Sequence, residues 1–227
     1  MRQVLAPIHS DGWRFVAIFA GVSVVLYLIA HWLGWLGFLA TAWCAYFFRD
    51  PWRVTPMRAG LVVAPADGVI SSVGLAPPPK ELEMGGAPMR RISIFLNVLD
   101  VHVNRMPMGG RVVKRHHHSG KFLNASLDKA SEENERMALR LATAEGPDIA
   151  VVQIAGLIAR RIVCDVDAGH EVTAGQRFGL IRFGSRTDVY LPQDWAPLAI
   201  EGQRAVGGET VIADARSSEP PRLGTEH

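Results

Sequence analysis

Residues 178–191, FGLIRFGSRTDVYL, place a Gly-Ser pair between two stretches that favour β-strands. Before the pair, Phe178–Phe183 is apolar apart from Arg182, and after it Asp188–Leu191 is again typical of a strand. Glycine and serine are common where the chain turns between two strands. The stretch therefore predicts two β-strands joined by a short connection that contains Gly184 and Ser185.

Similar β-rich runs recur along the chain after Asp50, separated by residues that form turns. The other runs are Leu61–Ala64, Ile92–Val98, Arg111–Val113, Met137–Leu141 and Ile149–Ile154. Strands this numerous and closely spaced predict a mainly β (α+β) fold, an antiparallel sandwich or barrel. We expect only a few short helices in this part, near Ala155–Arg161 and Asp128–Glu135.

Two segments near the C-terminus repeat one pattern. Residues 172–179 and 206–213 each contain a valine, a glycine turn, a polar pair and a strand. This pattern resembles the hairpin elements of lipoyl/biotinyl-type barrels. We expect the β-rich domain to cover residues 51–215 and to be followed by a flexible tail, residues 216–227.

The N-terminal part has a different composition. From Phe15 to Phe48, 34 residues contain no Asp, Glu, Lys or Arg, which is too long for one membrane span and slightly short for two. Gly34 and Gly37 are expected to break this run near its middle. Because Arg residues flank both of its ends, residues 1–50 predict a membrane-associating helical hairpin with both ends in the cytoplasm. We therefore expect the protein at the cytoplasmic face of the inner cell membrane. A signal peptide and a buried helix pair are the alternatives.

Overall charge and cysteine content exclude several classes of protein. The 227 residues include 24 Lys and Arg against 22 Asp and Glu, and a net charge of +2 argues against a nucleic-acid partner. The two cysteines, Cys44 and Cys164, form no CxxC motif or Cys/His ligand spacing. We therefore expect neither a disulfide framework nor a structural metal.

The Gly184-Ser185 pair does not fit a hydrolase. The nucleophile elbow G-x-S-x-G needs glycine two residues before and after the serine, where this chain has Phe183 and Thr187. A rearrangement of the peptide bond has different requirements: a residue without a side chain before the serine, a general base, and a turn held by strands on both sides. Gly184 meets the first requirement, and the flanking strands are expected to meet the third.

Five motifs, in this order along the chain, resemble those of the phosphatidylserine decarboxylase proenzymes of the short bacterial type. They are Ala64–Gly68 (APADG), Phe95–Pro107 (FLNVLDVHVNRMP), Gly120–Phe122 (GKF), Glu133–Arg136 (ENER) and Phe183–Ser185 (FGS). The resemblance runs from the hydrophobic hairpin to about Ala213. It implies a membrane enzyme that converts phosphatidylserine to phosphatidylethanolamine and CO2.

The same resemblance implies self-cleavage between Gly184 and Ser185. Ser185 Oγ attacks the Gly184 carbonyl, and the resulting ester is eliminated to leave a pyruvoyl group made from Ser185. This group is the implied cofactor, and it forms a Schiff base with the amine of the serine headgroup. The implied products are a β chain of residues 1–184 and an α chain of residues 185–227, which form a heterodimer that can associate further.

The resemblance also assigns residues to the self-cleavage. It implies His102 as the base and Asp67 as the residue that orients it, by the logic of a catalytic triad. Longer bacterial members carry a second histidine three residues after the first, where this chain has Arg105. His102 could instead serve decarboxylation, with Arg105 binding the carboxylate or phosphate of the substrate.

Two further residues are expected to bind substrate. His118 ends a run of three histidines, which we interpret as a loop at the mouth of the substrate site. The alternative is a metal site, for which at most His116 and His118 could share a face. Arg136 could pair with the lipid phosphate, or with Glu132 or Glu133.

Two functions from other classes remain as alternatives. One is a membrane-tethered lipoyl/biotinyl-like carrier or adaptor without catalysis, but none of the four lysines lies in either glycine-turn segment. The other is a membrane-anchored serine hydrolase, which the missing elbow argues against.

Overall fold

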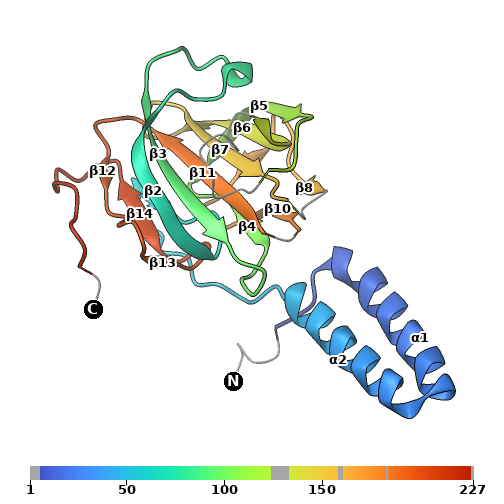
Figure 1. Cartoon of the computed structure of the whole chain (residues 1–227). Helices are drawn as coiled ribbons and strands as arrows, with labels where there is room; N and C mark the ends of the chain where they lie inside the picture. The colour runs from blue at the N-terminus through green and yellow to red at the C-terminus, as the bar shows by residue number, and fades with distance from the viewer. Residues whose placement is uncertain (1–5, 124–132, 158–160, 183, 226–227) are drawn as a thin grey trace. The chain divides into compact units, whose positions relative to one another are not determined.

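The computed structural model describes residues 6–123, 133–157, 161–182 and 184–225, and these form two compact units that divide between Trp52 and Arg53. The first unit consists of a short 3-10 turn and two helices (Figure 1). Their bounds are Ser10–Gly12 (η1), Trp13–Ile29 (α1) and His31–Phe47 (α2). The predicted helical hairpin is therefore confirmed.

The two helices pack closely through small residues. A side chain at Gly37 would come within 2.6 Å of Ser23 Oγ, and one at Gly34 would collide with Tyr27. The Ser23 and Thr41 hydroxyls lie 3.1 Å apart across the interface. The expectation that Gly34 and Gly37 break the apolar run is wrong: the break is at Ala30, which is extended, and the glycines let the helix backbones approach.

One helical run among the described residues, Ser10–Ile29, is long and apolar enough to cross a membrane. Its 20 residues correspond to about 30 Å of helix, the thickness of a bilayer core. A signal sequence near the N-terminus has the same length and composition.

The second unit is mainly antiparallel β-structure, which confirms the predicted fold class. Its largest sheet is a curled half-barrel of eight strands in the order β13-β2-β3-β11-β7-β6-β5-β9 (Figure 1). In that order the strands are Arg204–Ala205, Gly68–Ala76, Met89–Leu96, Ser185–Leu191, Ile149–Ile154, Arg136–Thr143, Gly110–His118 and Glu171–Val172.

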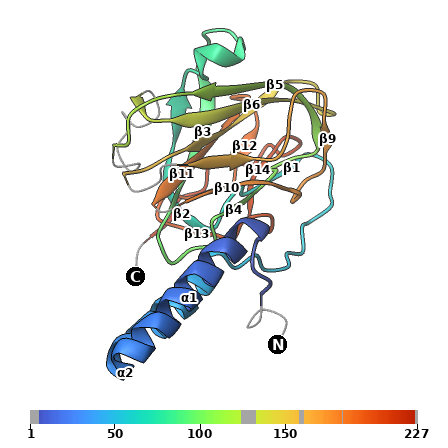
Figure 2. The same cartoon turned by 90° about the vertical axis from the view of Figure 1, so that its right-hand side faces the viewer.

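Two three-stranded sheets complete the unit and pack against the same core (Figure 2). The first, β1-β14-β12, consists of Leu61–Val63, Val211–Asp214 and Ala196–Pro197. The second, β4-β10-β8, consists of Val103–Arg105, Arg177–Ile181 and Ile162–Cys164. Core residues such as Val62, Phe178 and Ile212 are fully buried in these smaller sheets.

The two faces of the large sheet have different surroundings. On the inner face, Ile94 of β3, Val151 of β7 and Val189 of β11 belong to the main hydrophobic core. On the outer face, Val152 and Tyr190 pack in a second cluster with Leu82 of the turn η2, Lys80–Leu82. Since side chains alternate along a strand, every residue of β11 is assigned to one face by its register.

The two repeated segments fold alike but do not form hairpins. Each is a short strand, a turn with a glycine at positive φ, and a second strand. The strands that flank each turn pair with other strands: β9 with β5, β10 with β4 and β8, β13 with β2, and β14 with β1 and β12. The turns therefore carry the chain from one sheet to another.

The structure does not confirm the two expected short helices. Ala155, Gly156, Leu157 and Arg161 are not helical, and residues 158–160 lie outside the described residues. Most of the other expected helix, residues 128–132, also lies outside them. The structure does contain the short turn η2, which the sequence did not predict.

Candidate active site at the start of β11

Ser185 is the first residue of β11 rather than part of a turn. Its side chain lies on the inner face with Val189 and is fully buried. Among the residues that the structure describes, its Oγ has no hydrogen-bond partner. Gly184, just before it, has a φ of 57°, in the left-handed region that favours glycine. The pair therefore combines a buried hydroxyl with a backbone conformation that suits a residue without a side chain.

Three strand ends meet at this edge of the sheet. Because β2 and β11 both run antiparallel to β3, both begin where β3 ends, and Phe95 pairs with Val69 on one side and with Arg186 on the other. Adjacent strands are about 4.8 Å apart, so the start of β2 lies roughly 10 Å from the start of β11. Asp67 immediately precedes β2, and Ser185 opens β11.

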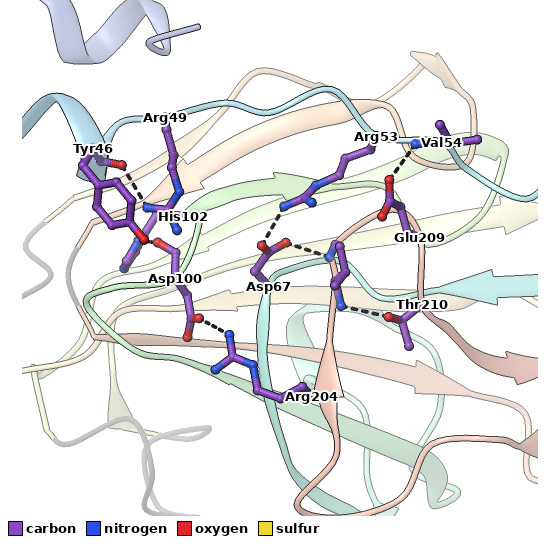
Figure 3. Close-up of polar contacts among 12 residues, drawn as sticks. Tyr46, Arg49, Arg53, Val54, Asp67, Asp100, His102, Arg204, Glu209 and Thr210 are labelled. Atoms are coloured by element: carbon purple, nitrogen blue, oxygen red, sulfur yellow. Dashed lines mark hydrogen bonds and ion pairs between the residues drawn. The ribbon is translucent and has the colours of Figure 1, made fainter. Parts of the chain in front are cut away.

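His102 follows the turn that leaves β3. It is fully buried, and its carbonyl oxygen accepts a hydrogen bond of 3.3 Å from the N–H of Ile181, the last residue of β10. Its ring Nδ1 lies 2.9 Å from the carbonyl oxygen of Asp100 (Figure 3). A carbonyl can only accept, so Nδ1 carries the hydrogen, and Nε2 of the neutral ring then bears a lone pair.

The carboxylate of Asp67 is held by other partners than His102. Its Oδ2 accepts from Arg53 at 2.6 Å, and its Oδ1 accepts from the N–H of Gly207 at 2.8 Å (Figure 3). Burial raises the pKa of Asp67 above its ordinary 3.8, and the charge of Arg53 and the N–H of Gly207 oppose that shift. The site therefore pairs a partly desolvated carboxyl with an arginine.

The turn between β13 and β14 frames Asp67. Gly207 of this turn approaches so closely that a Cβ there would lie 3.0 Å from the main chain of Ala66. Glu209 of the same turn accepts from the N–H of Val54 at 2.8 Å, which fixes the segment that carries Arg53 (Figure 3). Arg53 and Gly207 were missed in the sequence, where the only signal was the repeated glycine turn.

Asp100 was missed as well. Its carboxylate is buried and accepts from Arg204 at 2.5 Å, which ties the turn after β3 to β13 (Figure 3). Because the Asp100 carbonyl orients the ring of His102, this ion pair holds the histidine indirectly. Its only signal was its place in the motif Phe95–Pro107.

Arg105 is buried on β4, one residue after Asn104 and three after His102. Its Nη1 donates to the carbonyl of Gly175 at 3.0 Å, and its Cδ lies against Gly208. The Arg105 side chain therefore contacts the glycine turns of both repeated segments.

His118 and Arg136 are not brought to the face of Ser185. His118 pairs with Arg136, Arg136 with Ile154, and Ile154 with Arg186, so these four residues form one row across the sheet. Arg186 follows Ser185 directly, so the row projects from the outer face. There Arg136 pairs with Glu81 at 2.7 Å, a partner the sequence did not suggest.

The three histidines form the end of strand β5, so the expected loop is wrong. His117 Nε2 lies 3.4 Å from Glu135, and His118 is on the opposite face. Desolvation and the charge of Arg136 lower the pKa of His118. Within the described ranges, no group of three or more His, Cys, Asp or Glu side chains could hold a metal ion.

Two of the sequence motifs meet each other. The backbones of Lys121 and Asn134 pair in an isolated β-bridge. The buried Asn134 side chain donates to the carbonyl of Ala155 at 2.8 Å. Ala155 follows β7, which ends at the same edge where β11 begins. These motifs therefore shape the connection that borders the start of β11.

Comparison with known proteins identifies the class of this protein as a decarboxylase. A family model described as phosphatidylserine decarboxylase matches residues 40–213, which is most of the chain. The chain belongs to the phosphatidylserine decarboxylase family, as the resemblance of its motifs implied.

Proteins similar over nearly their whole length support this assignment. The chain is 58% identical over 220 residues to a phosphatidylserine decarboxylase proenzyme of Cereibacter sphaeroides, covering 97% of this chain and 95% of that protein. It is 58% identical to one of Paramagnetospirillum magneticum, covering 96% and 91%, and 56% identical to one of Granulibacter bethesdensis, covering 94% and 88%. All three are named as proenzymes. The carrier and hydrolase alternatives are set aside by this membership.

Proposed function

We propose that the chain cleaves itself between Gly184 and Ser185 and then decarboxylates phosphatidylserine to phosphatidylethanolamine. The observation that carries the proposal is the buried Ser185 hydroxyl, without a partner among the described residues, directly after a glycine at a φ of 57°. The proenzyme names of the relatives support the same reading for this chain.

The self-cleavage needs no atom from outside except water. Ser185 Oγ attacks the carbonyl carbon of Gly184, and the bond from that carbon to the Ser185 nitrogen breaks, so that an ester replaces the amide. Loss of the Ser185 Cα proton then breaks the Cβ–Oγ bond and releases the Gly184 carboxylate. Water converts the remaining dehydroalanine to a pyruvoyl group and ammonia.

His102 is the proposed base for the first step. The lone pair on its Nε2 can take the proton of the Ser185 hydroxyl, because Nδ1 is committed to the Asp100 carbonyl. The backbone bond between His102 and Ile181 ties the histidine to the strand that leads into the cleavage site. Asp67, paired with Arg53, is proposed to set the local charge rather than to contact the ring.

The pyruvoyl group supplies a keto carbonyl that condenses with the substrate amine and accepts the electron pair released with CO2. The residues fit such a group, because Ser185 is a buried polar residue at the end of a strand that two neighbours hold. Exclusion of water by the surrounding core protects a reactive carbonyl.

The proposed substrate lies in a membrane, and the N-terminal unit is proposed to keep the enzyme there. Large apolar side chains on α1 and α2 are exposed, including Val22, Leu28, Trp32 and Leu39. The helix pair has a single Asp, Glu, Lys or Arg, Arg14 in the first turn of α1. From Phe15 onward it fits the hydrocarbon of the inner membrane, with the β-rich domain on the cytoplasmic side.

The proposal gives Arg105 a role at the site but leaves His118 and Arg136 outside it. Arg105 is buried and bonded to Gly175, which supports a role in holding the site's glycine turns. His118 and Arg136 lie on the outer face, and Arg136 is paired with Glu81, so our proposal leaves both outside the reacting site.

Intact mass and a denaturing gel test the proposal. Wild-type protein should separate into pieces of 184 and 43 residues, the smaller one blocked to N-terminal sequencing. Ser185→Ala should stay a single inactive chain. Wild-type protein that remains uncut after prolonged incubation in membrane or detergent would contradict the proposal.

A further inference from the structure

A second polar group lies in the interior on the same face as Ser185. Gln153 of β7 and Asn104 of β4 are 1% and 0% exposed, and Gln153 Nε2 donates to Asn104 Oδ1 at 2.8 Å. The bond connects the large sheet to the sheet β4-β10-β8. Buried amides in folded proteins almost always have partners for their polar atoms, so any that lack one call for an explanation.

The hydrogen bonds fix which way each amide faces. Gln153 Nε2 also donates to the carbonyl of Val163 at 3.3 Å, and a carbonyl can only accept. Gln153 Oε1 therefore faces away from both partners, and Asn104 must present Oδ1 to Gln153 and turn Nδ2 away. In the described parts of the chain, Gln153 Oε1 and Asn104 Nδ2 are buried without a hydrogen-bond partner.

The register places these atoms beside the reacting residue. Gln153 pairs with Thr187, and Thr187 is two residues from Ser185 on the same face of β11. The hydroxyls of Thr187 and Ser185 are likewise buried without partners among the described residues. Four polar atoms from three strands thus line one region of the interior, and each could bind a polar ligand there.

We propose that Asn104 and Gln153 bind the amino-acid headgroup of the substrate, which rests on the proposed function. Asn104 Nδ2 is a donor and suits the carboxylate, whereas Gln153 Oε1 is an acceptor and suits the ammonium. One donor and one acceptor are the complement of a zwitterionic α-amino acid. The decarboxylated product keeps the amine but lacks the carboxylate, so Asn104 distinguishes substrate from product.

Asn104→Asp tests the donor by exchanging a single non-hydrogen atom. The variant keeps an oxygen for Gln153 Nε2 and replaces the N–H2 group with an acceptor. We expect the KM for phosphatidylserine in mixed detergent micelles to rise about tenfold or more, since a hydrogen bond to a charged group is lost and repulsion is gained. Inhibition by phosphatidylethanolamine should change less than about twofold.

Gln153→Met tests the acceptor. Because both lipids carry the amine, this variant should weaken phosphatidylserine and phosphatidylethanolamine alike. Gln203→Glu is the matched control for Asn104→Asp, because it also replaces an amide with a carboxylate. The exposed Oε1 of Gln203 accepts from the N–H of Ile200, so the variant keeps that contact and adds one negative charge elsewhere. The control should leave the KM unchanged.

Several outcomes overturn the inference. An unchanged KM for Asn104→Asp does so, as does an equal loss toward both lipids. A folded Asn104→Asp that stays uncut assigns the amide to self-cleavage instead. If Asn104→Asp does not fold, Gln153→Met decides: unchanged affinity for either lipid overturns the inference. Absence of CO2 release by the wild-type enzyme refutes the proposed function itself and is seen before any variant is made.

Discussion

The ring Nδ1 of His102 lies 2.9 Å from the main-chain carbonyl oxygen of Asp100. A carbonyl fixes the tautomer and the ring orientation, as a carboxylate does in a Ser-His-Asp triad. It offers no full negative charge to stabilise the imidazolium that forms when the ring takes a proton. In the self-cleavage proposed above, the carbonyl would orient the ring of His102 without supplying that charge.

Replacement of His102 should slow self-cleavage. A positioned general base contributes about 10²–10⁴-fold to a rate, so His102→Ala should accumulate as the uncut chain. The measurement is the time course of the 43-residue piece on a denaturing gel. His117→Ala, at an exposed position on β5, is the control and should be cut normally. Normal cutting of His102→Ala with loss of CO2 release would move the residue to the decarboxylation step.

Gly184→Ala should also slow the cut. The space around Gly184 is open, so a methyl group meets no neighbour, but at a φ of 57° an L-residue costs about 1–2 kcal/mol. The connection should therefore relax away from the reactive conformation while the fold persists. Gly74→Ala is the matched control, since Gly74 also has open space and lacks a positive φ. Equal cleavage rates in the two variants would show that the backbone conformation of Gly184 is unimportant.

The stability of the uncut chain should depend on pH through Asp67. Burial raises its pKa in the folded state, so the folded chain binds more protons than the unfolded chain between the two pKa values. Stability from this group is therefore lost as the pH rises through that interval. In the Ser185→Ala background, chemical denaturation should show the free energy of unfolding of Asp67→Asn rising relative to the parent as the pH increases above the ordinary pKa of 3.8. If the difference in unfolding free energy stays constant or shrinks as the pH rises, Arg53 affects the pKa of Asp67 more than burial does.

A charge in the middle of α1 should release the protein from membranes. Val22 is 53% exposed, and an Asp at the centre of a membrane helix costs about 2.5–3.5 kcal/mol, so Val22→Asp should weaken partition by roughly 100-fold. Flotation with phospholipid vesicles measures this partition. Val54→Asp places the same charge on an exposed apolar residue of the other unit and should float as wild type does. Comparable losses in both variants would argue against a membrane role for the helix pair.

Patterns of apolar residues were enough to predict the class of fold. The run Ile149–Ile154 is a strand throughout, and Ile92–Val98 is a strand as far as Leu96, because residues buried on both faces leave a continuous β-branched signal. Arg111–Val113 was underestimated: β5 continues to His118, since pairing with β6 overrides the polar sequence. The pairing partners of β9, β10, β13 and β14 depend on tertiary packing and could not be inferred from the repeated segments.

The candidate site was predictable only where a motif carried it. Gly184, Ser185, His102 and Asp67 all lie in motifs, and the structure brings the strand ends that carry them to one edge of the sheet. Arg53, Gly207 and the Asn104–Gln153 pair are joined by contacts between residues 14 to 140 positions apart. No periodicity or spacing in the chain records such pairings.

The strands that follow Gly184 in the chain pair with strands that precede it. Its strand β11 is inserted between β3 and β7, β13 lies along β2, and β14 lies along β1. Cutting one peptide bond at Ser185 removes none of these ladders. A molecule cut there would keep its shape without that bond, and the short fragment could leave only if the whole domain came apart. The new terminus would thus be held in place by the strands on either side of β11 rather than by a covalent bond to Gly184.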